Sequence, residues 1–147
     1  MRKILYRAKS LEKDNLGEWV YGDLIHHNEE AFYILPQNRE LSELYTYGIL
    51  VDENTIGQFI GIYDVNRKEV YEGDIITFLM GTYTVKWSLS DLSFRMERWI
   101  NEEEGVKEIV SFMLTPHHEH KITIVGKAVS TCVSPMLLAI SLTRAFS

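Results

Sequence analysis

The stretch "DIITFLMGTYTVKWS", residues 74–88, decides the fold. In its second half Tyr83, Val85 and Trp87 alternate with polar residues, and this period of two is typical of a half-buried β-strand. The first half is apolar on both faces and rich in strand-forming residues, which indicates a strand close to the core. A short join that contains glycine, residues 80–82, separates the halves, so we expect a β-hairpin.

The same alternation extends in both directions along the chain. Residues 93–99 and 120–129 each predict a further strand. Near the N-terminus, "KILYRA" (3–8), "GEWVYGDLI" (17–25) and "AFYILP" (31–36) predict a three-stranded meander. Turn-forming residues recur about every ten residues, which suits a small β-sandwich or barrel.

Two segments allow helices. Residues 103–114 fit a helix by apolar spacing and a strand by alternation, so both alternatives stay open. The tail "SPMLLAISLTRAF" (134–146) predicts a helix, because Ser134 can cap it and Pro135 occupies its first position. Apolar residues nearly surround this helix, so we expect it to pack on its own core or on another subunit.

Composition limits the classes of function. The 147 residues carry a formal net charge of −6, which argues against non-specific phosphate binding by the molecule as a whole. Two basic clusters, residues 2–9 and the pair Arg95 and Arg98, are interpreted as ordinary solvated strand faces. A single cysteine, Cys132, forms no intramolecular disulfide and fits a reducing compartment. Neither a signal peptide nor a membrane span is expected, so we predict a cytoplasmic protein.

The acidic residues around Gly73 raise the question of catalysis. Glu72 and Asp74 could act as a general acid and base, but no nucleophile or anion hole accompanies them. We interpret them as turn residues: Gly73 permits a positive φ, and Asp74 can accept backbone N–H groups. Residues 21–25, "YGDLI", repeat the arrangement. No catalytic residue is predicted.

The best candidate ligands for a metal lie in "TPHHEHK", residues 115–121. His117, His118 and His120 offer imidazole groups, which bind zinc, nickel or copper. A structural zinc site usually needs four protein ligands at separated positions. We therefore interpret the segment as a polar loop and predict neither a metal nor another cofactor.

Three blocks together carry a family resemblance: "WVYGDLI" (19–25), "TIGQFIGIYDVNRKEVYEGDIITF" (55–78) and "VKW" (85–87). In these blocks the chain resembles the YopX family of phage and prophage proteins, and the resemblance covers most of residues 3–90. It implies a mainly β fold, an N-terminal meander lobe followed by an SH3-like barrel that begins near Glu72, and a multimeric assembly. It supplies no biochemical activity and no catalytic residues.

The expected organisation is mainly β, in three parts. Residues 1–60 form the N-terminal β-meander lobe, residues 61–131 form the SH3-like β-barrel, and residues 132–147 form a C-terminal helical tail. The resemblance places the protein in the cytoplasm of a bacterial host cell, encoded by a phage or prophage.

These observations favour a non-enzymatic accessory protein. It would form a homo-oligomer and bind a host or phage protein. One alternative is a nucleic-acid-binding module on the barrel face, whose stacking and phosphate contacts would be Trp87, Phe94, Arg95 and Arg98. A second alternative is a metal-dependent hydrolase at the three histidines named above.

Overall fold

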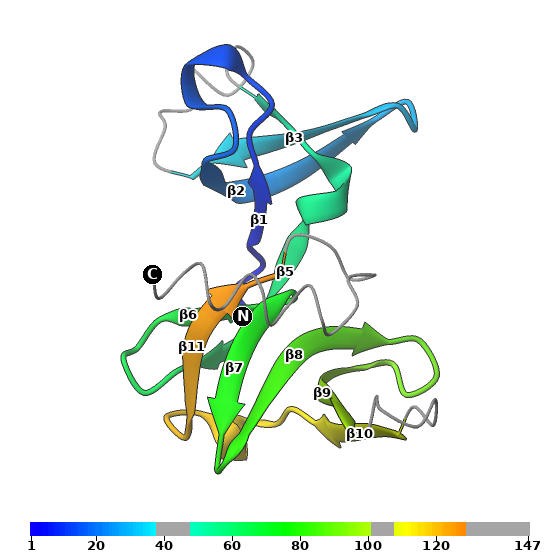
Figure 1. The fold of residues 1–147 in the computed structure, drawn as a ribbon. Coiled ribbons are helices and arrows are strands. Elements are labelled where there is room, and N and C mark those ends of the chain that lie inside the picture. The colour runs from blue at the N-terminus through cyan, green and yellow to red at the C-terminus, as the bar shows by residue number, and fades with distance from the viewer. Residues whose placement is uncertain (38–47, 101–107, 129–147) are drawn as a thin grey trace. The chain divides into compact units, whose positions relative to one another are not determined.

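A computed structural model describes residues 1–37, 48–100 and 108–128 (Figure 1). The chain divides into two compact units, Met1–Phe59 and Ile60–Ser147, and the described parts of both are built from antiparallel strands. The expectation of a mainly β protein is therefore confirmed. Among the described residues, no helix has the length and apolar character needed to span a membrane.

The first unit contains the predicted meander. Antiparallel pairing joins β1 (Tyr6–Lys9) to β2 (Trp19–His27), and β2 to β3 (Ala31–Pro36). Next to β3 lies β4 (Ile49–Val51), while β1 pairs on its other side with the start of β5 (Gly57–Tyr63). The strand order within this unit is thus β4-β3-β2-β1-β5.

One face of this sheet forms the core of the first unit. Ala8, Ile34 and Val51 are its buried members, and partly buried residues such as Val20 and Phe32 pack against them. A short 3-10 helix follows β4, and the Asp52 side chain caps it by accepting a hydrogen bond from the backbone N–H of Asn54.

The glycine of "YGDLI" differs from the prediction. Gly22 lies in the middle of β2 and does not form a turn, so the repeat of the Glu-Gly-Asp arrangement predicted there is wrong. A Cβ atom at Gly22 would collide with the backbone carbonyl of Leu35 on β3. The glycine is needed because the neighbouring strand approaches too closely for any side chain.

The second unit holds the end of β5, then β6 (Glu69–Tyr71) and a five-stranded sheet. The sheet consists of β7 (Asp74–Phe78), β8 (Gly81–Ser88), β9 (Ser93–Ile100), β10 (Glu108–Met113) and β11 (Ile122–Lys127). Its order is β10-β9-β8-β7-β11 (Figure 1). The predicted hairpin of β7 and β8 is confirmed, with Phe78 opposite Gly81.

Three expectations for the second unit have different outcomes. Residues 108–113 form a strand, so the helical alternative for this part of residues 103–114 is wrong. The sheet is open: β11 pairs with β7, and no pairing among the described residues joins it to β10, so the expected closed SH3-like barrel is not found. The predicted helix at 134–146 lies outside the described residues, as do residues 103–107 and Cys132.

The core of the second unit joins the β5–β6 hairpin to the sheet. Ile62 and Val70 come from the hairpin, and they pack against sheet residues such as Ile76, Val85 and Met96. All five are buried, and each fully buried aliphatic side chain contributes about 1.5–3 kcal/mol.

The predicted turn before β7 is confirmed. Gly73 adopts a φ of 86°, and the fully buried Asp74 carboxylate accepts a hydrogen bond of 2.8 Å from the Tyr71 backbone N–H. A second buried carboxylate, Asp64, accepts backbone N–H groups on both of its oxygens, including that of Asn66 at 2.8 Å. Each carboxylate stabilises a tight turn: Asp64 accepts hydrogen bonds within residues 64–68, and Asp74 accepts one within residues 71–74.

Candidate functional site

The sheet divides the four candidate nucleic-acid contacts between its two faces. Phe94 and Arg98 lie at alternate positions of β9 and share a face, and Trp87 on β8 is directly opposite Phe94. Arg95 lies on the other face. The structure therefore brings three of the four candidates together and separates the fourth.

The shared face carries a row of aromatic rings, which we call the aromatic face: Tyr83, Trp87, Phe94 and Phe112. Trp87 and Phe94 meet edge to face with ring centroids 4.9 Å apart, and Tyr83 and Phe112 do so at 6.1 Å. Trp87 is 41% exposed and Phe112 is 47% exposed. The face begins at the buried core residue Tyr83 and extends onto the protein surface.

Arg98 packs on the buried end of the aromatic face. Its guanidinium carbon lies 5.2 Å from the centre of the Tyr83 ring, a cation–π geometry. Gly81 makes room for this pair, because a Cβ atom there would lie 2.7 Å from the tyrosine ring and 2.8 Å from Arg98 Nη1. Gly81 thus serves packing, and the turn itself falls on Leu79 and Met80.

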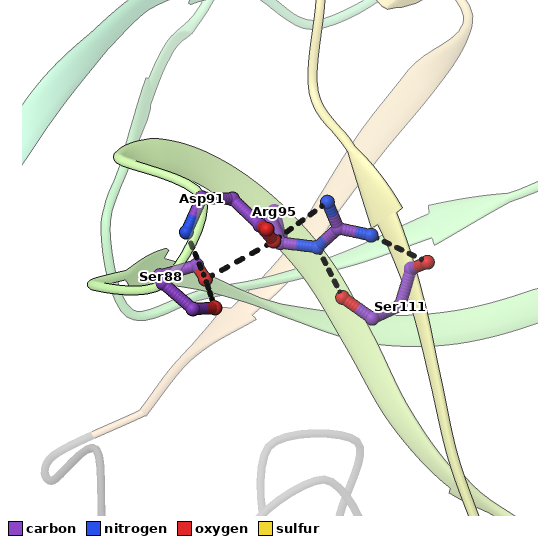
Figure 2. A network of polar contacts seen from close by, with 5 residues as sticks. Ser88, Asp91, Arg95 and Ser111 are labelled. Carbon is purple, nitrogen blue, oxygen red and sulfur yellow. Dashed lines mark hydrogen bonds and ion pairs between the residues drawn. The ribbon is translucent and has the colours of Figure 1, made fainter.

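Arg95 is held by its neighbours on the opposite face (Figure 2). Its Nη1 forms an ion pair of 3.1 Å with Asp91, while Nε donates to Ser111 Oγ and Nη2 to the Ser111 carbonyl oxygen at 2.9 Å. Asp91 also accepts a hydrogen bond from Ser88 Oγ at 3.2 Å. The network ties the β8–β9 turn to β10 and balances the charge of Arg95.

Exposed aliphatic side chains lie beside the aromatic face. The turn between β8 and β9 presents Leu89, which is 81% exposed, and Leu92, which is 73% exposed. They follow Trp87 in the chain by two and five residues. A group of exposed apolar residues of this kind marks an interaction surface on a protein more often than single scattered ones do.

The three histidines have separate positions in the structure. His118 caps the 3-10 helix Pro116–His118: its Nδ1 accepts the Thr115 backbone N–H at 3.2 Å. The Nδ1 of His120 lies 3.3 Å from the Asp64 carbonyl oxygen, and His117 is exposed. Across residues 1–37, 48–100 and 108–128, no three His, Cys, Asp or Glu side chains are placed to share a metal ion.

In the N-terminal basic cluster Arg2 and Lys3 are exposed, as predicted for a solvated face, whereas Arg7 differs from the prediction. Arg7 is buried, at 2% exposure, and its guanidinium carbon lies 4.7 Å from the centre of the Trp19 ring. Lys9 Nζ is 5.5 Å from the same ring, and Lys3 Nζ is 5.8 Å from that of Phe59. These cations pack on aromatic rings of the first unit, which the sequence did not reveal.

The sequence matches a known protein family over most of its length. A family model described as "YopX protein" matches residues 5–121. The chain belongs to the YopX family. YopX membership implies a phage-type protein, and it leaves the biochemical role open. No curated protein matches the sequence.

Tyr83 and Phe112 are the members of the aromatic face that were not predicted as contacts, and Phe112 was also not assigned to a strand with certainty. Its signal was present, since the strand alternative for residues 103–114 places Phe112 and Leu114 on one side. The helical alternative obscured that alternation. The register between strands, which the sequence does not reveal, places Phe112 opposite Met96, and Met96 is itself opposite Val85.

Proposed function

We propose that this YopX protein is a non-enzymatic accessory protein that acts through protein contacts, and that its aromatic face binds a second copy of the chain. The observation that carries the proposal is the exposure of Trp87 and Phe112 on a face continuous with the core. Aromatic residues are enriched at protein interfaces, and charged residues are depleted at their centres.

Local charge supports a protein partner on this hairpin. Arg95, which a polyanion would otherwise attract, is paired with Asp91 and bonded to Ser111. The leucines Leu89 and Leu92 add exposed apolar area next to Trp87. Burying such side chains in a contact releases free energy of about 25 cal/mol per Å² of apolar area.

The test is the mass in solution by light scattering across a concentration series. We expect the wild-type chain to be an oligomer and the double variant Trp87→Ser, Phe112→Ser to be a monomer. Ile25→Ser is the matched control, because Ile25 is 43% exposed and lies in the first unit; it should leave the mass unchanged. A wild-type monomer at every concentration would overturn self-association.

A second candidate function follows from the Arg98–Tyr83 pair. A guanidinium on the same face as Trp87 and Phe94 supports single-stranded nucleic acid as the partner of the aromatic face. A gel shift separates the two candidates. Nucleic-acid binding should weaken steeply with added salt and fail in Arg98→Ala, whereas self-association through apolar side chains should persist.

A further inference from the structure

The first unit contains an open pocket. Its volume is about 390 Å³, within the range of about 300–1,000 Å³ that holds small ligands. The lining comes from β2, from the last residue of β3, and from the residues that precede β1 and follow β3: Leu5, Trp19, Val20, Tyr21, Pro36 and Gln37. The pocket lies wholly within the first unit, so it is independent of the aromatic face.

Aromatic rings form one wall of the pocket. Trp19 and Tyr21 alternate on β2 and therefore point to the same side of the sheet. Tyr21 is 39% exposed, so its ring is accessible to a ligand. Leu5, which is only 5% exposed, adds an apolar side chain to the lining. A flat, apolar group is the natural occupant of such a site.

Cations lie along the same side of the sheet. Register places Arg7 opposite Tyr21 and Lys9 opposite Trp19. Both side chains pack over the Trp19 indole, which fixes the ring and brings positive charge to the pocket. Residues 1–9 contain four Lys or Arg and no carboxylate, although the whole chain carries a net charge of −6. Of these cations, Arg7 and Lys9 lie next to the lining residue Trp19, where they could attract an anionic ligand, while the Asp23 carboxylate lies at Gln37.

A polar group completes the site. The Gln37 side chain lines the pocket, and its Nε2 donates to Asp23 Oδ1 over 3.4 Å. This contact positions the Gln37 amide beside the pocket. Side-chain amides of this kind pair with the edges of nucleobases.

We propose that this pocket binds a nucleotide: the base packs against Tyr21 beside Trp19, the Gln37 amide meets the base edge, and Lys9 contacts the phosphate. A planar ring, a hydrogen-bonding edge and an anion are the three features that the lining matches. The small volume suits one nucleotide, either free or within a single strand. This inference does not depend on the aromatic face, and its failure would leave the proposed self-association intact.

The test measures binding to the full chain by calorimetry and fluorescence anisotropy. The probes are adenosine 5′-monophosphate and a short fluorescein-labelled oligodeoxyadenylate, with ribose 5-phosphate as the control that lacks a base. We expect saturable binding of the nucleotide probes only. Tyr21→Ala should weaken it by about tenfold, the effect of losing one base–aromatic contact. Lys9→Ala should weaken it and reduce its salt dependence.

Met80→Ala is the control, because it removes an exposed apolar side chain from the other unit, outside the aromatic face, and should leave binding unchanged. Trp87→Ala tests instead whether the oligonucleotide binds to the aromatic face. Circular dichroism verifies that each variant is folded. Tighter binding of the oligonucleotide than of the monophosphate identifies a single strand as the source, and equal binding identifies a free nucleotide. The proposal is overturned if neither probe saturates at millimolar concentration. It is also overturned if Trp87→Ala alone removes binding, or if ribose 5-phosphate binds as well as the nucleotide.

Discussion

At the scale of the residue, the turn between β7 and β8 stores backbone strain. Leu79 occupies its first position with a φ of 53°, a conformation that costs a residue with a side chain about 1–2 kcal/mol. The Leu79 side chain is 85% exposed and gains little from packing in return. Glycine is the usual residue at a positive φ of this kind.

Leu79→Gly should therefore stabilise the protein by about 0.5–1 kcal/mol, since relief of strain exceeds the entropy that glycine adds to the unfolded chain. The free energy of unfolding in urea measures the effect. Met80→Gly is the control, because Met80 is exposed as well, at 102%, but has no positive φ, and the change should not stabilise the protein. A loss of stability in Leu79→Gly would show that the leucine makes a contact worth more than its strain.

A buried carboxylate has the opposite effect on stability. Asp64 is fully buried and accepts the backbone N–H groups of Asn66, Lys68 and Ile124. Asp64→Ala would leave these donors without their acceptor, and we expect a loss of about 3 kcal/mol or more in the free energy of unfolding. Asp64→Asn keeps one acceptor oxygen and should lose less. Equal stability of the alanine variant and the wild type would mean that water replaces the carboxylate.

At the scale of the element, alternation in the sequence predicted the strands correctly, whereas the structural roles of two glycines, Gly22 and Gly81, were predicted wrongly. The meander and the β7–β8 hairpin follow from period-two patterns that one buried face imposes. The turn was expected at Gly81, but Gly81 instead gives space to Tyr83 and Arg98, and the positive φ falls on Leu79. A glycine signals either a special φ or a close approach, and only the pairing of strands distinguishes them.

Gly22 tests the close-approach role directly. Gly22→Ala places a Cβ atom against the Leu35 carbonyl oxygen, so β2 and β3 must separate locally, and we expect a loss of at least about 2 kcal/mol in the free energy of unfolding. Gly17→Ala is the comparison, because no atom lies within 4 Å of its added Cβ and only its φ of 78° opposes the change. Hydrogen exchange of the β2 and β3 amides should rise in Gly22→Ala alone. Unchanged exchange there would contradict the steric role.

At the scale of the whole molecule, the composition says less about the possible binding surfaces than the arrangement of the strands does. A net charge of −6 argues against binding to polyanions, yet Lys3, Arg7 and Lys9 pack on aromatic rings of the first unit. The sequence named Trp87, Phe94 and Arg98 as candidates, and the register of β8 and β9 places them on one face and Arg95 on the other. Which residues share a surface depends on pairings between distant strands, and these are invisible to local patterns.

The strand β5 has a consequence for how such a protein can be inherited. Its first residues pair with β1 in one unit, and Ile62 near its end enters the core of the other. The border between the units therefore falls inside a strand. A flexible linker at this position would instead have allowed one unit to be replaced independently of the other. A gene exchange that replaced one unit with that of a relative would have to preserve a strand matched to both cores at once. The two units should accordingly descend together.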